Sequence, residues 1–94
     1  MLATELDVRN PSGLHARPAS ALVRCAGTVR ARVRIANLAR PELEVDAKSI
    51  LGVLSLGVSA GGRIRVTADG DDEATAIDRI RELVAGGLGE AVAQ

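Results

Sequence analysis

The sequence predicts an α+β fold: an open-faced two-layer sandwich in which a four-stranded antiparallel sheet carries three helices on one face, in the order β-α-β-β-α-β-α. Two observations lead to it. Each helical segment has one apolar stripe, and each convincing strand has one apolar face, so every element needs one partner layer. The length of 94 residues suits one hydrophobic core, so residues 1–94 are expected to form a single domain.

The first half of the chain predicts a strand, a helix and a second strand. Leu2–Val8 alternates loosely between apolar and polar residues, as strands do, and Asn10–Leu14 combines Pro, Ser and Gly in a turn. Apolar residues then recur at helical spacing over Ala16–Gly27, where Pro18 suits the first turn and the glycine ends the helix. Residues 28–35, TVRARVRI, alternate without a fault and predict the clearest strand.

The second half predicts two more strands and two helices. Leu43–Ala47 reads as a returning strand, and Ser49 is placed to cap a short helix that continues to about Leu54. Residues 63–68, RIRVTA, alternate as a fourth strand, and Asp69–Glu73 supplies a turn with an acidic first helical turn. The last helix is expected to turn Ile77, Ile80, Leu83 and Val84 inward and then to fray through residues 86–94.

The composition excludes several classes of function. The chain has no Phe, Tyr or Trp, so it lacks the aromatic faces on which single-stranded nucleic acids stack. Twelve basic and twelve acidic residues cancel, so no overall field draws the chain to DNA or to a membrane. With no apolar run of membrane-spanning length and no signal-peptide core, we expect no membrane insertion and a cytoplasmic location.

Metal and cofactor chemistry is not expected either. One histidine and one cysteine, Cys25, cannot complete a metal site, and Cys25 is expected to pack as a small apolar residue of the first helix. The outward arginines Arg30, Arg32 and Arg34 could contact RNA, but such a run is more often a solvated sheet face, so no nucleic-acid partner is expected.

His15 is the only histidine, and its setting suggests phosphoryl chemistry. It immediately precedes the predicted first helix, whose unbonded N–H groups would hold a phosphoryl group attached to the ring. Arg17 could add a charge-assisted hydrogen bond, and a neutral imidazole is nucleophilic through a ring nitrogen. These residues alone leave two interpretations open, a phosphoryl acceptor or an ordinary surface histidine at a loop end.

Two segments resemble one family. GLHARPAS, around His15, resembles the active-site segment of HPr, the histidine phosphocarrier family of the sugar phosphotransferase system. AKSILGVLSLGVSAG resembles the second signature of that family, around its regulatory serine. The resemblance runs from the first strand to the last helix, and the fold of the family is the two-layer sandwich predicted above.

The resemblance implies a role for each matching residue. His15 would accept a phosphoryl group from phospho-Enzyme I and pass it to IIA domains of sugar permeases, while Arg17 would steady that group in both transfers. Ser49 matches the serine modified by an HPr kinase/phosphorylase, which would regulate docking or recruit a transcriptional regulator; it could equally be only a helix cap. The implied protein is a monomeric covalent carrier rather than an enzyme with its own small substrate. Its docking surface would comprise Ser20, Arg24, Ile50, Leu51 and Leu54, with Val53 and Leu56 directed to the core.

The chain also departs from the family pattern. The segment RIANLARPELEV is a few residues longer than in free-standing members and resembles loops of fused or dedicated phosphotransferase proteins. The alternatives are therefore a dedicated relay, of the dihydroxyacetone kinase or nitrogen type, or a regulatory binding module that acts through Ser49. Family members often end in a carboxylate that neutralises the active-site arginine, but because this chain extends past Glu90, that role is not assigned to it.

Overall fold

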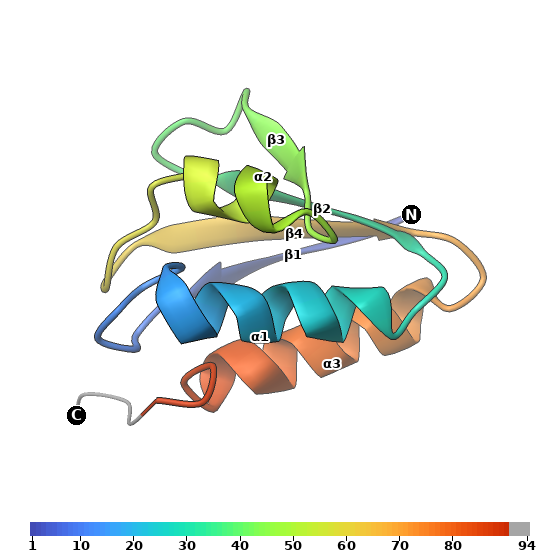
Figure 1. Cartoon of the computed structure of the whole chain (residues 1–94). Coiled ribbons are helices and arrows are strands. Elements are labelled where there is room, and N and C mark those ends of the chain that lie inside the picture. The colour runs from blue at the N-terminus through green and yellow to red at the C-terminus, as the bar shows by residue number, and fades with distance from the viewer. Residues whose placement is uncertain (91–94) are drawn as a thin grey trace.

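A computed structural model describes residues 1–90 of the chain, and its elements follow the predicted order (Figure 1). Two helices, α1 and α3, lie side by side along one face of the sheet, and α2 lies nearer the end of the sheet formed by β2 and β3. The predicted open-faced sandwich is confirmed. The elements are β1 (Leu2–Asp7), α1 (Ala16–Gly27), β2 (Arg32–Asn37), β3 (Glu44–Asp46), α2 (Ile50–Ser55), β4 (Arg63–Asp69) and α3 (Glu73–Ala85).

The four strands form one antiparallel sheet in the order β1-β4-β2-β3. In the centre of the sheet, Ile35 lies opposite Val66, and both side chains are fully buried. On the open face, Arg34 of β2 lies opposite Asp46 of β3, and Arg32 lies opposite Asp69 of β4. Carboxylates therefore lie across from two of the three arginines that the sequence places on this face.

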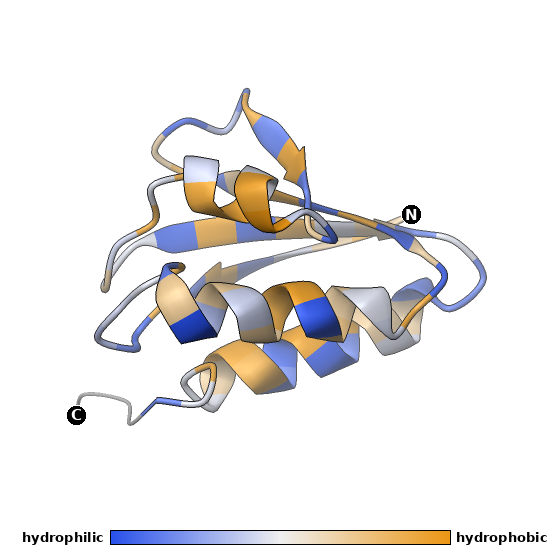
Figure 2. Cartoon of the chain, viewed as in Figure 1, coloured by the Kyte–Doolittle hydropathy of each residue, from blue (hydrophilic) through white to orange (hydrophobic). Residues whose placement is uncertain are grey.

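Alternating side chains divide the strands between core and solvent. Figure 2 shows this alternation along β4, where Ile64, Val66 and Ala68 are fully buried. These residues meet Leu22 of α1 and Ile80 of α3, so aliphatic side chains alone fill the space between the layers.

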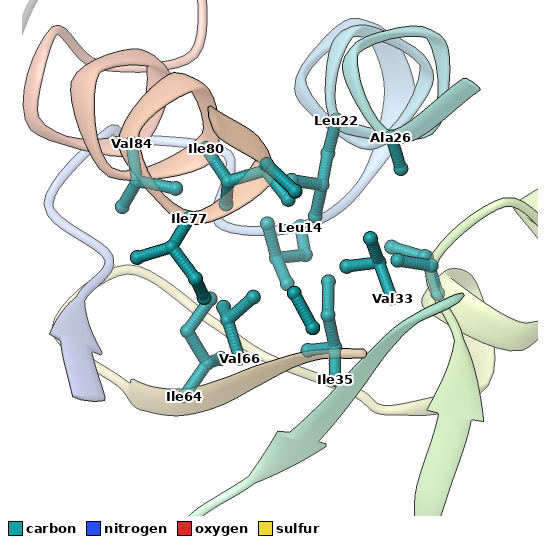
Figure 3. Close-up of a cluster of buried hydrophobic side chains, with 14 of the residues drawn as sticks. Leu14, Leu22, Ala26, Val33, Ile35, Ile64, Val66, Ile77, Ile80 and Val84 are labelled. Atoms are coloured by element: carbon teal, nitrogen blue, oxygen red, sulfur yellow. The ribbon is translucent and has the colours of Figure 1, made fainter. Parts of the chain in front are cut away.

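Leu14 lies within this core, between the helices and the sheet (Figure 3). Its side chain is fully buried, whereas its chain neighbour His15 is exposed. The core therefore anchors the residue directly before the candidate functional histidine.

The second strand begins later than predicted. Residues 28–31 alternate as expected, with Val29 and Ala31 buried, but they are not part of β2, which begins at Arg32. The N–H groups of Arg30 and Ala31 instead donate to the carboxylate of Asp72, at 2.8 and 2.7 Å. The period-2 pattern thus assigned the buried face correctly. The backbone N–H groups of this segment bond to the Asp72 carboxylate instead of to a neighbouring strand.

The expected fraying after the last helix is wrong for residues 86–90, and residues 91–94 lie outside the described part of the chain. The Leu88 N–H donates to the Leu83 carbonyl at 2.9 Å, and the Gly86 N–H donates to the Glu82 carbonyl at 2.9 Å. These bonds close the end of α3 and bury Leu88, which is 1% exposed. The segment is an ordered turn because a buried leucine holds it.

Among residues 1–90, none of the helices combines the length and the apolar character needed to cross a bilayer.

Candidate functional site

His15 occupies the amino end of α1 with its side chain in solvent. It is the N-cap residue, with extended backbone angles of φ −132° and ψ 161°, and its side chain makes no capping hydrogen bond. The imidazole is therefore not used to satisfy the helix end. Its ring is accessible to a macromolecular partner.

The backbone after His15 has an unusual conformation. Ala16 has φ of 54°, in the left-handed region, which costs a residue with a Cβ roughly 1 kcal/mol. The N–H groups of Ala16 and Arg17 precede any carbonyl of their own helix that could accept from them. Pro18, buried in the first turn, has no N–H to satisfy. A helix start with free amides can bind an anion held on the neighbouring imidazole.

Four predicted site residues surround one shallow depression between α1 and α2. Its volume is about 590 Å³. It is lined by Arg17, Ser20, Val23, Arg24 and Ile50. The structure therefore brings the candidate phosphoryl-binding arginine together with three of the predicted docking residues.

The remaining docking candidates lie on the outer side of α2. Leu51 is 77% exposed and Leu54 is 37% exposed, whereas Val53 on the same helix is fully buried. Leu56 is partly buried against the core, as expected. The short helix α2 therefore carries apolar side chains on two sides, and only one side contacts the rest of the chain.

Ser49 is the N-cap of α2. Its Oγ accepts a hydrogen bond from the Gly52 N–H at 3.1 Å, which satisfies one free amide of the helix. The serine that the resemblance singles out therefore has a structural role in the unmodified protein.

Two residues of the site receive no role from the sequence: Asn10 is only part of a predicted turn, and Glu90 stays unassigned because the chain extends past it. Asn10 is fully buried in the turn before His15, and Glu90 lies 80 positions later in the chain. The Asn10 Nδ2 donates to Glu90 Oε1 at 3.0 Å. The turn Asn10–Leu14 gives no sign of a distant partner, and the signal for Glu90 is the carboxylate that family members often carry near the end of the chain.

The local electrostatics of Glu90 follow from these bonds. Hydrogen bonds from the Asn10 side chain, then from the Ser12 N–H and Ser12 hydroxyl, lower the pKa of the Glu90 carboxyl below its ordinary value. In contrast, burial raises the pKa of the Cys25 thiol, which packs against the core from α1.

Residues 1–90 contain no cluster of three His, Cys, Asp or Glu side chains suited to a metal ion.

Comparison with known proteins places the chain in one family. The family model described as "PTS HPr component phosphorylation site" matches residues 2–86. A phosphocarrier protein HPr of Xylella fastidiosa is 43% identical over 83 residues, which cover 88% of this chain and 90% of that protein. A multiphosphoryl transfer protein of Haemophilus influenzae is 40% identical over 90% of this chain but only 17% of its own length, so this chain spans a small part of that relative.

A solved structure gives the same result. The crystal structure of HPr-C-His from Thermoanaerobacter tengcongensis superposes with a TM-score of 0.91 at 36% identity, covering 98% of this chain and 100% of that one. The resemblance predicted from the GLHARPAS and AKSILGVLSLGVSAG segments is confirmed. This chain belongs to the HPr family, the phosphocarrier proteins of the phosphotransferase system.

Proposed function

We propose that His15 accepts a phosphoryl group from phospho-Enzyme I and passes it to IIA domains of sugar permeases. The observation that carries the proposal is the exposed His15 at the amino end of α1, with Arg17 on the first helical turn, in a chain of the HPr family. The whole of residues 1–94 acts as one HPr-like domain in this proposal. It works in the cytoplasm as a monomer and without a cofactor.

The chemical step is an in-line exchange between two imidazole rings. A neutral ring nitrogen of His15 attacks the phosphorus of the Enzyme I phosphohistidine, a new N–P bond forms, and the N–P bond to the donor ring breaks with its electron pair returning to that ring. The His15 ring gives up the proton on its other nitrogen and the donor ring gains one, so both rings end neutral. The amides of Ala16 and Arg17 and the Arg17 guanidinium face the charge on the phosphoryl oxygens. In the second transfer, phosphorylated His15 is the donor and a histidine of the IIA domain is the acceptor, and the same kinds of bond form and break.

Docking uses the depression between α1 and α2 together with the outer side of α2. Ser20 and Arg24 supply polar contacts, and Ile50, Leu51 and Leu54 supply apolar area. Because this surface adjoins the first turn of α1, a partner seated on it would cover His15 and exclude water from the transfer.

The proposal is tested by intact-mass measurement after incubation with phosphoenolpyruvate and Enzyme I. We expect one added phosphoryl group that is lost in acid, because phosphoramidates hydrolyse there, and no addition to the His15→Ala variant. His15 is the only histidine in the chain, so a phosphohistidine can form at one position, and the His15→Ala variant tests that position. An unchanged mass of the wild-type protein would overturn the carrier function.

Ser49 supplies a second, regulatory part of the proposal. Phosphate on its Oγ would bring charge beside Ile50 and Leu51 and would weaken docking to Enzyme I, or recruit a transcriptional regulator. Incubation with ATP and an HPr kinase/phosphorylase should add an acid-stable phosphoryl group that is absent from Ser49→Ala. Its failure to appear would remove the regulatory role and leave the carrier role intact.

A dedicated relay is the second candidate function. Relatives named multiphosphoryl transfer proteins contain a matching segment within a much longer chain, which favours transfer within a fused or dedicated system. Competition between purified IIA acceptors of the sugar, dihydroxyacetone kinase and nitrogen types for phosphorylated protein would separate these acceptors by their transfer rates.

A further inference from the structure

The loop before His15 is bound by Glu90, which lies in the turn after α3. Glu90 Oε1 accepts hydrogen bonds from the Asn10 Nδ2 and the Ser12 N–H, both at 3.0 Å, and its Oε2 accepts from the Ser12 hydroxyl at 2.8 Å. Three donors from two loop residues thus converge on one carboxylate. The loop and the end of α3 lie at the same end of the molecule (Figure 1).

Asn10 links this carboxylate to the backbone next to the active site. It is fully buried, and its Nδ2 donates both to Glu90 and to the Gly13 carbonyl, the latter at 2.9 Å. A side-chain amide has two N–H protons, and both are used here. The opposite amide orientation would aim Oδ1 at two acceptors, so Glu90 and Gly13 together set the direction of this side chain.

Gly13 and Leu14 connect the Asn10–Glu90 contact to His15, because their backbone groups are also hydrogen-bonded. The Gly13 N–H donates back to the Asn10 carbonyl at 3.1 Å, and the Leu14 N–H donates to the Val58 carbonyl at 3.0 Å. Leu14 is also buried in the core. The chain reaching His15 is therefore held by Glu90 on one side and by the segment around Val58 on the other.

The residue after His15, Ala16, has a strained backbone conformation, so the contacts that hold the preceding loop also affect whether this strain is maintained. Ala16, directly after His15, holds a left-handed φ of 54°, a conformation that persists only where the surrounding structure enforces it. A loop free to relax would let Ala16 return to an ordinary conformation and turn the imidazole away. Only a rigid loop keeps His15 and the amides in one arrangement.

The turn after α3 that contains Glu90 is held in place by its own contacts. Leu88 is buried, and the Glu90 N–H donates to the Gly87 carbonyl at 2.9 Å. The carboxylate therefore approaches the loop from an ordered turn, which lowers the conformational entropy lost in forming its three bonds.

From these contacts we propose that Glu90 is a positioning residue for the phosphorylation of His15. Its carboxylate holds the Asn10–Gly13 loop so that the imidazole is aligned for in-line attack, and it makes no contact with the phosphoryl group. The kinetic part of this inference rests on the carrier function proposed above; the structural part, that Glu90 orients His15, does not.

The experiment compares Glu90→Ala with Glu90→Gln and with Glu82→Gln, a control that changes an exposed carboxylate on α3. In Glu90→Ala, the maximal rate of phosphorylation by phospho-Enzyme I should fall about tenfold, while the KM for the variant changes less than about twofold because the docking surface is intact. Glu90→Gln keeps an acceptor oxygen and should recover part of the rate. Glu82→Gln should match the wild type.

NMR spectra of the same proteins test orientation without any transfer. In Glu90→Ala, the backbone amide signals of His15 and Ala16 should move and the Ser12 amide should exchange faster with solvent. If the wild type accepts no phosphoryl group, the carrier function fails, and the His15 signals still decide whether Glu90 positions the ring. Unmoved His15 signals, or an unchanged transfer rate despite faster Ser12 exchange, would overturn the proposal.

Discussion

Gly13 lies against the backbone of Val58 so closely that a Cβ on the glycine would sit 2.4 Å from the Val58 carbonyl oxygen. Its φ of 61° also places it in the left-handed region. Two independent reasons therefore require glycine two residues before His15. The contact brings the segment after α2 against the loop that precedes His15.

We expect Gly13→Ala to destabilise the fold by more than about 2 kcal/mol, because it adds a backbone clash to left-handed strain. Urea unfolding measures the change. Gly57→Ala is the matched control: Gly57 has φ of 64° and nothing within 4 Å of its added Cβ, so it should lose only about 1 kcal/mol. Equal losses in the two variants would contradict the close packing of Gly13.

Substitution of Arg17 should slow transfer without unfolding the protein. The side chain is exposed, so Arg17→Ala should leave stability nearly unchanged, and loss of a charged donor to the phosphoryl oxygens should lower the maximal rate roughly 100-fold. Arg17→Lys keeps the charge but loses the planar guanidinium group, so its maximal rate should lie between those of the wild type and Arg17→Ala. Stopped-flow phosphorylation by Enzyme I measures these rates.

The control for this prediction is Arg81→Ala on α3, whose side chain is 52% exposed and pairs with Asp78. Its transfer rate should equal that of the wild type. A loss as large as that of Arg17→Ala would mean that general charge attraction, rather than contact with the phosphoryl group, sets the rate.

Leu51→Ala should weaken docking selectively. Leu51 is 77% exposed, so its loss should alter the free energy of unfolding by less than about 0.5 kcal/mol. Loss of its apolar contact should raise the KM with Enzyme I about tenfold. Leu43→Ala, at an exposed leucine before β3, removes the same group elsewhere and should leave the KM unchanged. Similar effects of the two variants would remove α2 from the docking surface.

Ser49 should show separable structural and regulatory effects. Ser49→Ala removes the acceptor for the Gly52 N–H and should cost about 1 kcal/mol of stability, whereas Ser49→Asp retains a capping oxygen and should remain near the wild type. The aspartate should nevertheless slow phosphorylation of His15 by Enzyme I because it adds charge to the docking surface. Normal kinetics for Ser49→Asp would argue that Ser49 serves only as a cap.

Acid should remove the contribution of Glu90 to stability. Its pKa in the folded protein lies below the ordinary value of 4.5, so the folded state binds a proton less readily than the unfolded chain. The stabilisation is therefore complete above about pH 4.5 and is lost as the pH falls through the lowered pKa of the folded state. Thermal unfolding of wild type and Glu90→Gln should differ at pH 7 and converge in acid, and a constant difference would contradict the assigned hydrogen bonds.

Local periodicity was sufficient to predict the layers of this fold. The alternation in RIRVTA placed Ile64, Val66 and Ala68 in the core because a strand with one covered face has few other solutions. The start of β2 was not predictable in this way, since it depends on Asp72, some forty positions away, whose carboxylate binds the amides of Arg30 and Ala31.

The candidate site likewise contains residues that local sequence could predict and residues that it could not. His15, Arg17 and Ser49 stand in short recognisable segments, so sequence alone could nominate them. The role of Asn10 depends on Glu90, and their meeting requires the whole of α3 to fold back along the sheet. No local pattern encodes a contact of that span.

The two ends of α3 have different surroundings, and this matters for attaching anything to the protein. At the start of the helix, Glu73 pairs with the Met1 ammonium group at 3.0 Å, while the turn after its far end reaches the loop before His15. A dye, tag or surface linkage on Met1 would thus lie at the opposite end of a molecule 35 Å long, clear of the loop before His15. A group attached to a side chain of the turn after α3 would instead lie beside the loop before His15.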